Sequence, residues 1–238
     1  MKKLFSFILV VFLTISAPQI VRASTPLPSN LIAYNSTTGE KLLKRSVSHS
    51  FFELSMQFLT QRNQAYCGVA SITMVLNALG VKGPNDPVYS PYHPITQDNF
   101  FTPAMKKILD QDRVFHHGMT LDQASDAAAQ FGVKSTAIHS NTLTQNKMRK
   151  ILISVLKNKH KYAVVNFFRP GLKENGGGHF SPIAAYDYRS DRFLILDVAR
   201  YKYPPIWVKT EDLWNGINTV DTASQKKRGI LLLKTQSL

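Results

Sequence analysis

A dense run of apolar residues follows Cys67. Between this cysteine and Gly80 the apolar positions fall on nearly every side of a helix, which indicates a helix buried around most of its circumference. The residues that form the pattern are Val69, Ile72, Met74, Val75, Leu76 and Leu79. Gly80 is typical of the residue that follows the last turn of a helix. The pattern therefore predicts a buried helix that begins at or beside Cys67.

Capping residues predict three more helices in the first two thirds of the chain. A Thr-Pro pair supplies an N-cap and a first-turn proline for a helix over residues 102–109. Two Thr-x-x-Gln capping boxes open helices over residues 120–131 and 142–159. Residues 81–97 hold several prolines, which are poorly tolerated inside helices, so this segment is predicted to be a loop.

The remainder of the chain changes to short runs of β-branched and aromatic residues separated by turn residues. These runs are Tyr162–Phe168, Phe180–Tyr186, Phe193–Leu196 and Gly229–Lys234. They predict strands of a mostly antiparallel sheet. Because helices come first and strands follow, the sequence indicates an α+β fold in which a helical lobe packs against a sheet lobe, with a cleft between them.

The first residues have the features of an export signal. Met1–Lys3 is basic, Leu4–Ile15 is almost wholly apolar, and Ala23 ends a motif that a signal peptidase recognises. We therefore predict a signal peptide over residues 1–23, a single exported, periplasmic domain over residues 24–238, and no stable membrane insertion after cleavage. A retained N-terminal anchor is the alternative. The polar segment 24–40 is predicted to be a loose leader.

The net charge of the whole chain is +14, which favours anionic partners. The basic residues are dispersed and are not gathered on one element beside aromatic platforms, so the sequence disfavours a nucleic-acid-binding protein. A metal enzyme is also disfavoured, because the chain has one cysteine, no His-x₃-His pair on a helix and no paired acidic cluster. An acidic small substrate or an anionic envelope surface fits the charge better.

Cys67 is the single cysteine, so it forms no disulfide within this chain although disulfides are common in exported proteins. One interpretation is a buried thiol that acts as a small hydrophobic group. The other is a nucleophile, since the N–H groups and dipole at the start of a helix favour negative charge and lower the pKa of a thiol. A nucleophile needs a base, which directs attention to the histidines.

His179 is the histidine best placed to act as that base. It follows three glycines and begins a predicted strand, whereas the other six histidines lie in loops or polar segments and are predicted to be solvated. Asp197 ends the next strand. If the two strands form a hairpin in which the numbers of facing residues sum to 378, Ser181 faces Asp197 and His179 is its diagonal neighbour on the same face. A register shift of one residue would separate them.

Together Cys67, His179 and Asp197 match a nucleophile, a base and a residue that orients the base. Gln61, six residues before the thiol, is the preferred donor to an oxyanion with the N–H of Cys67, and Gln64 is the competing candidate. Each residue alone has a structural explanation. Their combination predicts an acyl transferase or hydrolase with a cysteine nucleophile.

Three motifs resemble the phytochelatin synthases, over residues 51–234. They are Gln61-x₅-Cys67 with Ala-Tyr-Cys-Gly-Val-Ala-Ser around the thiol, Gly-His-Phe-Ser-Pro around His179, and Leu-Asp-Val-Ala at Asp197. The resemblance implies a papain-like α+β fold with the site between the lobes. It also implies that Cys67 cleaves the Cys–Gly bond of glutathione, holds γ-glutamylcysteine as a thioester and passes it to water or to a second glutathione. His179 would be the acid and base, and Gln61 the oxyanion donor.

The same resemblance implies contacts for the γ-glutamyl end of glutathione. Asp221 and Arg228 match the family's acid and base for its ammonium and carboxylate, and Asn166 and Arg169 match further contacts. The alternative for these residues is a set of solvated surface charges. No cofactor is implied for the first half-reaction, and Cd or Zn would enter as a metal–glutathione thiolate.

Two departures from the family change the expected activity. Eukaryotic members continue into a second, cysteine-rich region, which this sequence lacks, so hydrolysis or a single transfer is expected to dominate over long polymers. Export is the second departure, and it points to glutathione turnover in the periplasm. The alternatives are an exported papain-like peptidase or amidase that acts on a peptide or a cell-wall cross-link, and a basic non-enzymatic envelope-binding protein. Whether the protein forms a homodimer is left open.

Overall fold

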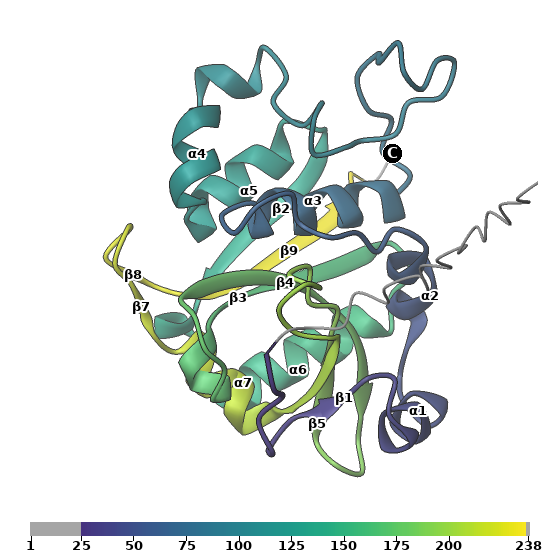
Figure 1. The fold of residues 1–238 in the computed structure, drawn as a ribbon, viewed down its shortest axis with the longest axis vertical. Coiled ribbons are helices and arrows are strands. Elements are labelled where there is room, and N and C mark those ends of the chain that lie inside the picture. Colours follow the sequence, from purple (N-terminus) through teal and green to yellow (C-terminus); the bar gives the residue numbers. More distant parts are fainter. Residues whose placement is uncertain (1–24, 237–238) are drawn as a thin grey trace, which may run out of the picture.

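The computed structural model describes residues 25–236 and is built around one large sheet (Figure 1). The predicted signal peptide over residues 1–23 lies outside the described residues. Seven antiparallel strands form the sheet in the order β1-β6-β5-β4-β3-β9-β2, and β7 pairs with β8 in a separate hairpin. The strands are β1 Ile32–Ala33, β2 Val133–His139, β3 Lys161–Phe168, β4 Gly178–Asp187, β5 Arg192–Ile195, β6 Ile206–Lys209, β7 Val220–Asp221, β8 Lys226–Lys227 and β9 Gly229–Thr235.

Seven α-helices surround the sheet in the part of the chain that the structure describes. They are α1 Thr37–Lys44, α2 His49–Met56, α3 Cys67–Ala78, α4 Gln111–His117, α5 Leu121–Ala129, α6 Gln145–Leu156 and α7 Thr210–Ile217. Short 3-10 helices are η1 Met105–Lys107, η2 Ser140–Thr142 and η3 Arg169–Leu172. The predicted α+β class is confirmed, and so are the predicted helix after Cys67, the helix opened at residue 120 and the four predicted strands.

Helices cover both faces of the sheet. Helices α2, α3 and α5 pack with Val164 and Leu231 on one face, whereas α6 and α7 pack with Val165 and Ile230 on the other. Successive residues of a strand point to opposite faces, which is why neighbours in β3 and β9 belong to different clusters. The order of the elements along the sequence predicted a helical lobe separate from the sheet. The structure instead has helices on both faces of the sheet.

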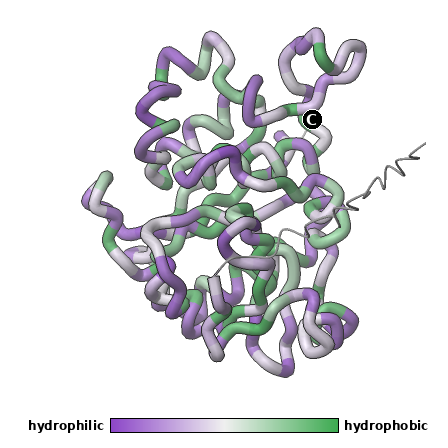
Figure 2. Tube along the Cα trace, in the orientation of Figure 1, coloured by the Kyte–Doolittle hydropathy of each residue, from purple (hydrophilic) through white to green (hydrophobic). Residues whose placement is uncertain are grey.

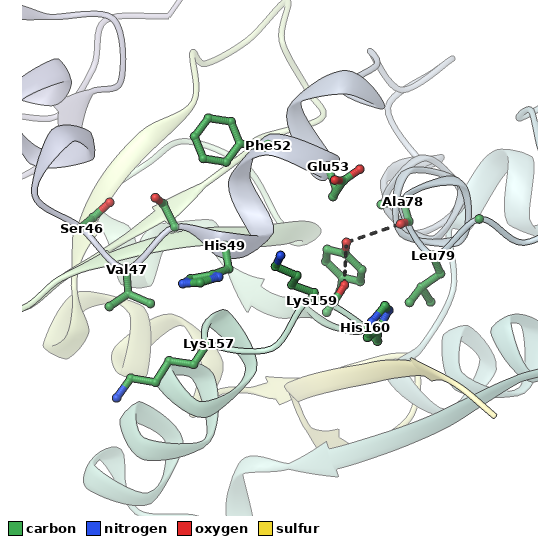
Figure 3. Close-up of a pocket in the computed structure, with 13 residues that line it drawn as sticks. Ser46, Val47, His49, Phe52, Glu53, Ala78, Leu79, Lys157, Lys159 and His160 are labelled. Carbon is green, nitrogen blue, oxygen red and sulfur yellow. Dashed lines mark hydrogen bonds between the residues drawn. The ribbon is translucent and has the colours of Figure 1, made fainter. Parts of the chain in front are cut away.

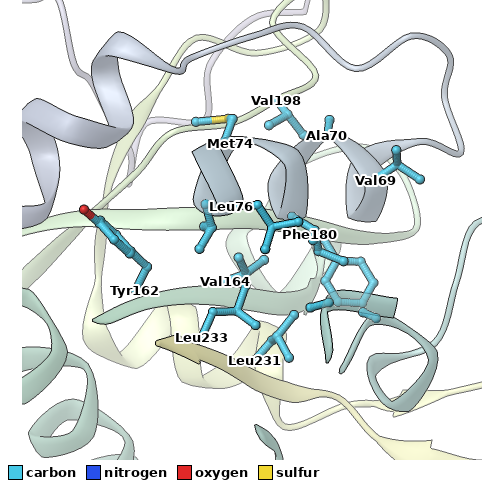
Figure 4. Packing of buried hydrophobic residues seen from close by; sticks show 14 of the residues in the cluster. Val69, Ala70, Met74, Leu76, Tyr162, Val164, Phe180, Val198, Leu231 and Leu233 are labelled. Carbon is cyan, nitrogen blue, oxygen red and sulfur yellow. The ribbon is translucent and has the colours of Figure 1, made fainter. Parts of the chain in front are cut away.

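Helix α3 is the most deeply buried helix and lies across the central strands (Figure 4). Its side chains from Val69 to Leu76 are buried, and Leu76 and Phe180 belong to the same cluster. Each of the Val, Ile, Met and Leu side chains among them contributes roughly 1.5–3 kcal/mol when it leaves water. Hydrophobic segments gather in the sheet and in this helix, and hydrophilic ones in the outer loops (Figure 2). The first turn of α3 is thereby fixed against β4.

Two of the predicted helices differ in the structure. Residues 102–109 contain only the short helix η1, because Asp110 caps a new helix: its side chain accepts hydrogen bonds from the N–H groups of Asp112 and Arg113 and starts α4. The helix predicted from residue 142 begins at Gln145 instead. Its N-cap is Thr144, whose hydroxyl accepts from the N–H of Lys147.

Residues 24–40 were predicted to be loose, and this prediction is wrong for the residues that the structure describes. Strand β1 pairs with β6 at the edge of the sheet. Helix α1 follows at once, capped by Ser36, whose hydroxyl accepts from the N–H of Gly39 at 3.0 Å. Polar composition concealed these edge contacts. Of the helices in the described part of the chain, none combines the length and the hydropathy that a membrane span requires.

Candidate active site

Helix α3 presents Cys67 at its first position because the preceding turn ends there. The side-chain oxygen of Asn63 accepts hydrogen bonds from the N–H groups of Ala65 and Tyr66 at 2.8 and 3.1 Å, which closes the turn. Four residues after Cys67, on the same face of the helix, the Ser71 hydroxyl donates to the Phe180 carbonyl at 3.1 Å. The free thiol of Cys67, 7% exposed, therefore faces the start of β4.

His179 and Asp197 lie beside this thiol, on β4 and just after β5. The Nε2 atom of His179 is 2.8 Å from Oδ1 of Asp197 and 3.0 Å from the hydroxyl of Ser181. The Asp197 carboxylate also accepts the N–H of Ala199 at 2.8 Å, which fixes its orientation. The structure thus brings together the three residues that the sequence analysis selected as nucleophile, base and orienting residue.

The strand register explains how His179 and Asp197 meet. Near the site Ile183 faces Ile195, in agreement with the predicted sum of 378, and the N–H of Leu196 donates to the Pro182 carbonyl. Beyond Ala184 a β-bulge shifts the register by one residue, so Tyr186 faces Phe193. The assumed register is correct at the end of the hairpin that carries the site and wrong at its turn.

The pKa values of these groups are shifted in the directions that favour an ion pair. Burial raises the pKa of the Cys67 thiol, but a hydrogen bond and the positive charge of His179 lower it by more, with help from the Phe180 N–H. Burial lowers the pKa of His179, and the Asp197 carboxylate reverses this and raises it. Burial raises the pKa of the Asp197 carboxyl, but the neighbouring cations His179 and Arg169 lower it by more and hold it well below the usual range. The arrangement supports a thiolate beside an imidazolium.

A buried ionic network lies behind the His179 ring. Arg169 donates to Asp197 at 3.1 Å and pairs with Glu174, and all three side chains are almost fully buried. Burial lowers the pKa of Arg169, but the opposing carboxylates raise it by more and hold the guanidinium protonated, whereas burial raises the pKa of Glu174 to about 7. The sequence analysis did not identify Glu174. Its one signal is a carboxylate in the turn between the strand that ends near Arg169 and the glycines before His179.

The thiol opens onto a pocket of about 370 Å³ between the helices and the sheet. One wall includes Cys67 at the start of α3, Gln64 in the turn before it and Met119 in the loop between α4 and α5. The other wall contains Gly178, Asp221 and Arg228. This volume lies within the range of about 300–1,000 Å³ that is usual for small-molecule sites.

Asp221 and Arg228 form the charged part of the pocket. The two side chains are 3.6 Å apart and both are largely buried. Burial lowers the pKa of Arg228, against the charges of Asp221 and the Cys67 thiolate, which raise it. The Nε atom of Arg228 is buried and has no hydrogen-bond partner among the described residues. The structure therefore places both residues in the pocket and not among solvated surface charges.

Asn166 and Arg169 occupy a different position. The Asn166 amide donates to the His179 carbonyl at 3.3 Å, and its own oxygen is buried without a partner among the described residues. Arg169 points toward Asp197 and Glu174. Neither side chain is in the wall of the thiol pocket. Both support the strand that carries His179.

The Gln61 side chain is buried, and its amide makes two hydrogen bonds within the protein. Its Nε2 donates to the Asn63 carbonyl at 2.6 Å and to the Tyr201 hydroxyl at 3.0 Å. Burial raises the pKa of Tyr201, the hydrogen bond from Gln61 lowers it, and the charge of the Cys67 thiolate raises it further. Gln64 is exposed and lines the pocket directly. Tyr201 was missed because nothing in the local sequence indicates this contact.

The hairpin that carries Asp221 is held in place by His139. The two ring nitrogens of His139 contact the Lys227 carbonyl and, at 2.8 Å, the Asp122 carboxylate. Asp122 also accepts from Lys226 at 2.8 Å. The prediction that His139 is solvated is therefore wrong: its half-buried ring joins β8 to α5. Among the described residues, no group of three or more His, Cys, Asp or Glu side chains is arranged to hold a metal ion.

The fold and the thiol pocket together define an α+β protein with a single cysteine paired to histidine and aspartate. A family model described as phytochelatin synthase matches residues 22–230. The chain therefore belongs to the phytochelatin synthase family, and the resemblance predicted from its motifs is confirmed.

Proteins similar to this chain include enzymes of plants and of a yeast. The chain is 34% identical over 207 residues to glutathione gamma-glutamylcysteinyltransferase 3 of Lotus japonicus, covering 85% of this chain and 42% of the relative. It is 32% identical over 219 residues to glutathione gamma-glutamylcysteinyltransferase 1 of Arabidopsis thaliana, covering 90% of this chain and 44% of the relative. It is 29% identical over 212 residues to the glutathione gamma-glutamylcysteinyltransferase of Schizosaccharomyces pombe, covering 87% of this chain and 50% of the relative. The chain thus spans half or less of the length of these relatives.

Proposed function

We propose that this chain is a glutathione γ-glutamylcysteinyltransferase and hydrolase in which Cys67, His179 and Asp197 act as a papain-like triad. The observation that carries the proposal is the Cys67 thiol at the start of α3, hydrogen-bonded to His179, whose Nε2 is 2.8 Å from Asp197. A thiolate next to an imidazolium is a strong nucleophile and a ready proton donor at once. The names of the relatives support glutathione as the substrate.

In the first half-reaction, the Cys67 thiolate attacks the carbonyl carbon of the Cys–Gly bond of glutathione. The C–N bond breaks, and the His179 imidazolium gives its proton to the departing amine of glycine. The product on the enzyme is a γ-glutamylcysteinyl thioester of Cys67. Asp197 keeps the imidazole in one orientation and stabilises its positive charge, without itself taking the proton.

In the second half-reaction, the now neutral His179 acts as a base. It removes a proton from water or from the amino group of a second glutathione as either attacks the thioester carbonyl. Water yields γ-glutamylcysteine, and glutathione yields the first phytochelatin. In both cases the sulfur of Cys67 leaves as a thiolate and the imidazolium is restored.

The developing oxyanion would be stabilised by the Gln61 amide together with the backbone N–H of Cys67. The N–H groups of the first helical turn have no acceptor within the helix, so that of Cys67 is suited to this role. The Gln61 amide is oriented by its bond to Asn63 and shares its second N–H with Tyr201. The Gln61 amide would exchange its hydrogen bond to the Tyr201 hydroxyl for one to the oxyanion when the oxyanion forms.

Asp221 and Arg228 would recognise the γ-glutamyl end of glutathione. This end carries an ammonium and a carboxylate on one carbon, so a neighbouring acid and base can bind both. The unpartnered Nε atom of Arg228 supplies a buried donor for the substrate carboxylate. Asn166 and Arg169 would act on the substrate indirectly, because they lie behind His179 and set the position and charge of the triad.

Further parts of the proposal concern the setting of the reaction. The first half-reaction would need no cofactor, and Cd or Zn would take part as a substrate, bound to glutathione thiolates. Residues 24–238 would act as one catalytic domain in the periplasm after removal of residues 1–23. The net charge of +14 for the whole chain suits an anionic substrate such as glutathione.

The proposal is tested by comparing glutathione with a panel of ordinary peptides and cell-wall fragments. Glycine release from glutathione is expected to fall by about tenfold or more in Asp221→Asn, which loses one charged contact with the substrate. The control is Asp98→Asn, an exposed carboxylate in an ion pair with Arg62 outside the pocket. Efficient cleavage of the peptides, unaffected by Asp221→Asn, would favour the peptidase alternative. Slow alkylation of Cys67 by iodoacetamide, as for an inert buried thiol, would favour the envelope-binding protein.

Gly178→Ala is expected to raise the KM for glutathione by roughly tenfold, equivalent to about 1.4 kcal/mol. A Cβ atom at this position would lie 2.7 Å from a guanidinium nitrogen of Arg228 and would displace that side chain from the pocket. Gly177→Ala is the matched control, because a Cβ atom there meets nothing within 4 Å. Initial rates of glycine release measure both. An equal KM in the two variants would contradict the placement of Arg228 in the binding pocket.

A further inference from the structure

A second cavity, of about 900 Å³, lies away from the thiol (Figure 3). Its walls are residues 46–53 on and before α2, residues 78–80 at the end of α3, and residues 157–162 between α6 and β3. It shares no residue with the thiol pocket. Helix α3 begins at Cys67 and ends at Ala78, so its length of about 16 Å separates the two cavities.

The cavity offers apolar surface to a ligand. Val47 and Leu79 line it, and Phe52, on the outer face of α2, is 67% exposed beside it. The buried Tyr162 also lines the cavity, and its phenolic hydroxyl is 3.4 Å from each of the Ala78 and Lys159 carbonyls. A concave surface with apolar lining and a few polar groups is typical of a small-molecule site.

Three basic side chains around the cavity make no polar contact with the described residues. Lys159, His49 and His160 have no side-chain hydrogen bond or ion pair with the residues that the structure describes. Figure 3 shows the Lys159 ammonium directed across the cavity toward α2. Lys157, by contrast, points away and lies over the Tyr188 ring, 6.0 Å from its centroid. An anion placed in the cavity would therefore find a free ammonium without breaking an existing contact.

Glu53 limits the charge that the cavity can accept. It is the one carboxylate of the lining, and its charge reaches Tyr162, where it adds to the effect of burial in raising the pKa to about 12. The carbonyl end of α3 at residues 78–80 is also partly negative. A ligand with several anionic groups would be repelled from these two sides. One anionic group near Lys159, with an apolar body against Phe52 and Leu79, satisfies the whole lining.

We propose that this cavity binds a small amphipathic anion: an acyl or aromatic body that carries a single acidic group. The apolar walls remove the body from water, and Lys159, assisted by the two histidines, pairs with the acidic group. The site is independent of the thiol pocket and of the activity proposed for it, since the two share no residue.

Calorimetric titration with dodecanoate, below its micelle concentration, tests this site. We expect one saturable site per chain, with a dissociation constant raised about tenfold by Lys159→Gln. Phe52→Ala is expected to weaken binding as well. Lys107→Gln is the matched control, an exposed lysine that does not line the cavity. All of these side chains are exposed, so the variants are expected to fold.

A second probe with the same chain and the opposite charge distinguishes a charged site from non-specific adsorption. Dodecyltrimethylammonium is expected to show no saturable binding. Equal binding of the two amphiphiles, or a dodecanoate affinity unchanged by Lys159→Gln, would overturn the proposal. Titration of Cys67→Ser should reproduce the affinity of the unmodified protein, so the outcome does not depend on whether glutathione is the substrate of the thiol pocket.

Discussion

Cys67→Ser and Cys67→Ala are expected to release glycine from glutathione at least about 10⁴-fold more slowly than the unmodified protein. The chain has no second cysteine that can replace the nucleophile. A serine hydroxyl in the same position lacks the thiolate character that the hydrogen bond and charge of His179 give to Cys67. Quantification of free glycine over time measures the loss.

Both Cys67 variants replace a small buried side chain at a helix start, so the fold should be retained. Thermal unfolding followed by circular dichroism is the control, and Ala70→Ser provides a comparable substitution one turn further along α3, at a fully buried position. Glycine release by Cys67→Ala at the rate of the unmodified protein would show that Cys67 is structural and would remove the proposed mechanism.

Asp197→Asn is expected to lower kcat by about 10²- to 10⁴-fold. The amide keeps the shape of the carboxylate but not the charge that raises the pKa of His179. With less imidazolium beside it, the Cys67 thiol loses the interaction that outweighs its burial, and its pKa rises. Single-turnover measurements of glycine release isolate this effect from product dissociation.

The same substitution should change the pH profile. In the unmodified protein, the thiolate is present above the lowered pKa of Cys67 and activity falls as pH rises through the raised pKa of His179. In Asp197→Asn the acidic limb should move to higher pH and the alkaline limb to lower pH. Asp187→Asn is the matched control, since Asp187 is equally buried and pairs with Arg45 away from the thiol. An unchanged profile in Asp197→Asn would contradict the role of its charge.

The parts of the fold that were predictable are those with strong local patterns. The apolar run after Cys67 and the β-branched runs of β3, β4, β5 and β9 correspond to elements buried on most of their surface. Elements at the margins were missed or misplaced. Strand β1 is two residues long and exists because β6 pairs with it, and no local pattern distinguishes such a strand from a loop.

The residues of the site likewise differ in how far the local sequence predicts them. Cys67 and His179 were identified because a helix start and a glycine-flanked strand start are visible in the sequence. The prediction that they lie close to Asp197 depended on an assumed register between β4 and β5. A β-bulge near Ala184 shifts this register toward the turn, so the assumed register holds only at the end of the hairpin that carries the site. A bulge is set by packing around the strand and was not detectable from alternation alone.

Contacts between distant segments were beyond the sequence analysis. Glu174 completes a network with Arg169, and His139 fastens the hairpin of Asp221 to α5 across the pocket wall. Both depend on side chains that meet only after the sheet has formed. A single sequence does not show which distant side chains will pair. His139 was therefore predicted to be solvated, and Arg169 was predicted to contact the substrate, whereas it lies behind His179.

Mass spectrometry of the intact protein, quenched with acid shortly after mixing with glutathione, detects the acyl intermediate on which the proposed mechanism depends. We expect Cys67 to gain the mass of one γ-glutamylcysteinyl group as a thioester and Cys67→Ala to gain nothing. A disulfide with whole glutathione would be distinguished because it retains glycine, which makes it heavier than the thioester by the mass of glycine less two hydrogens. Turnover of glutathione without any acyl group on Cys67, or an acyl group on another residue, would show that Cys67 is not the nucleophile.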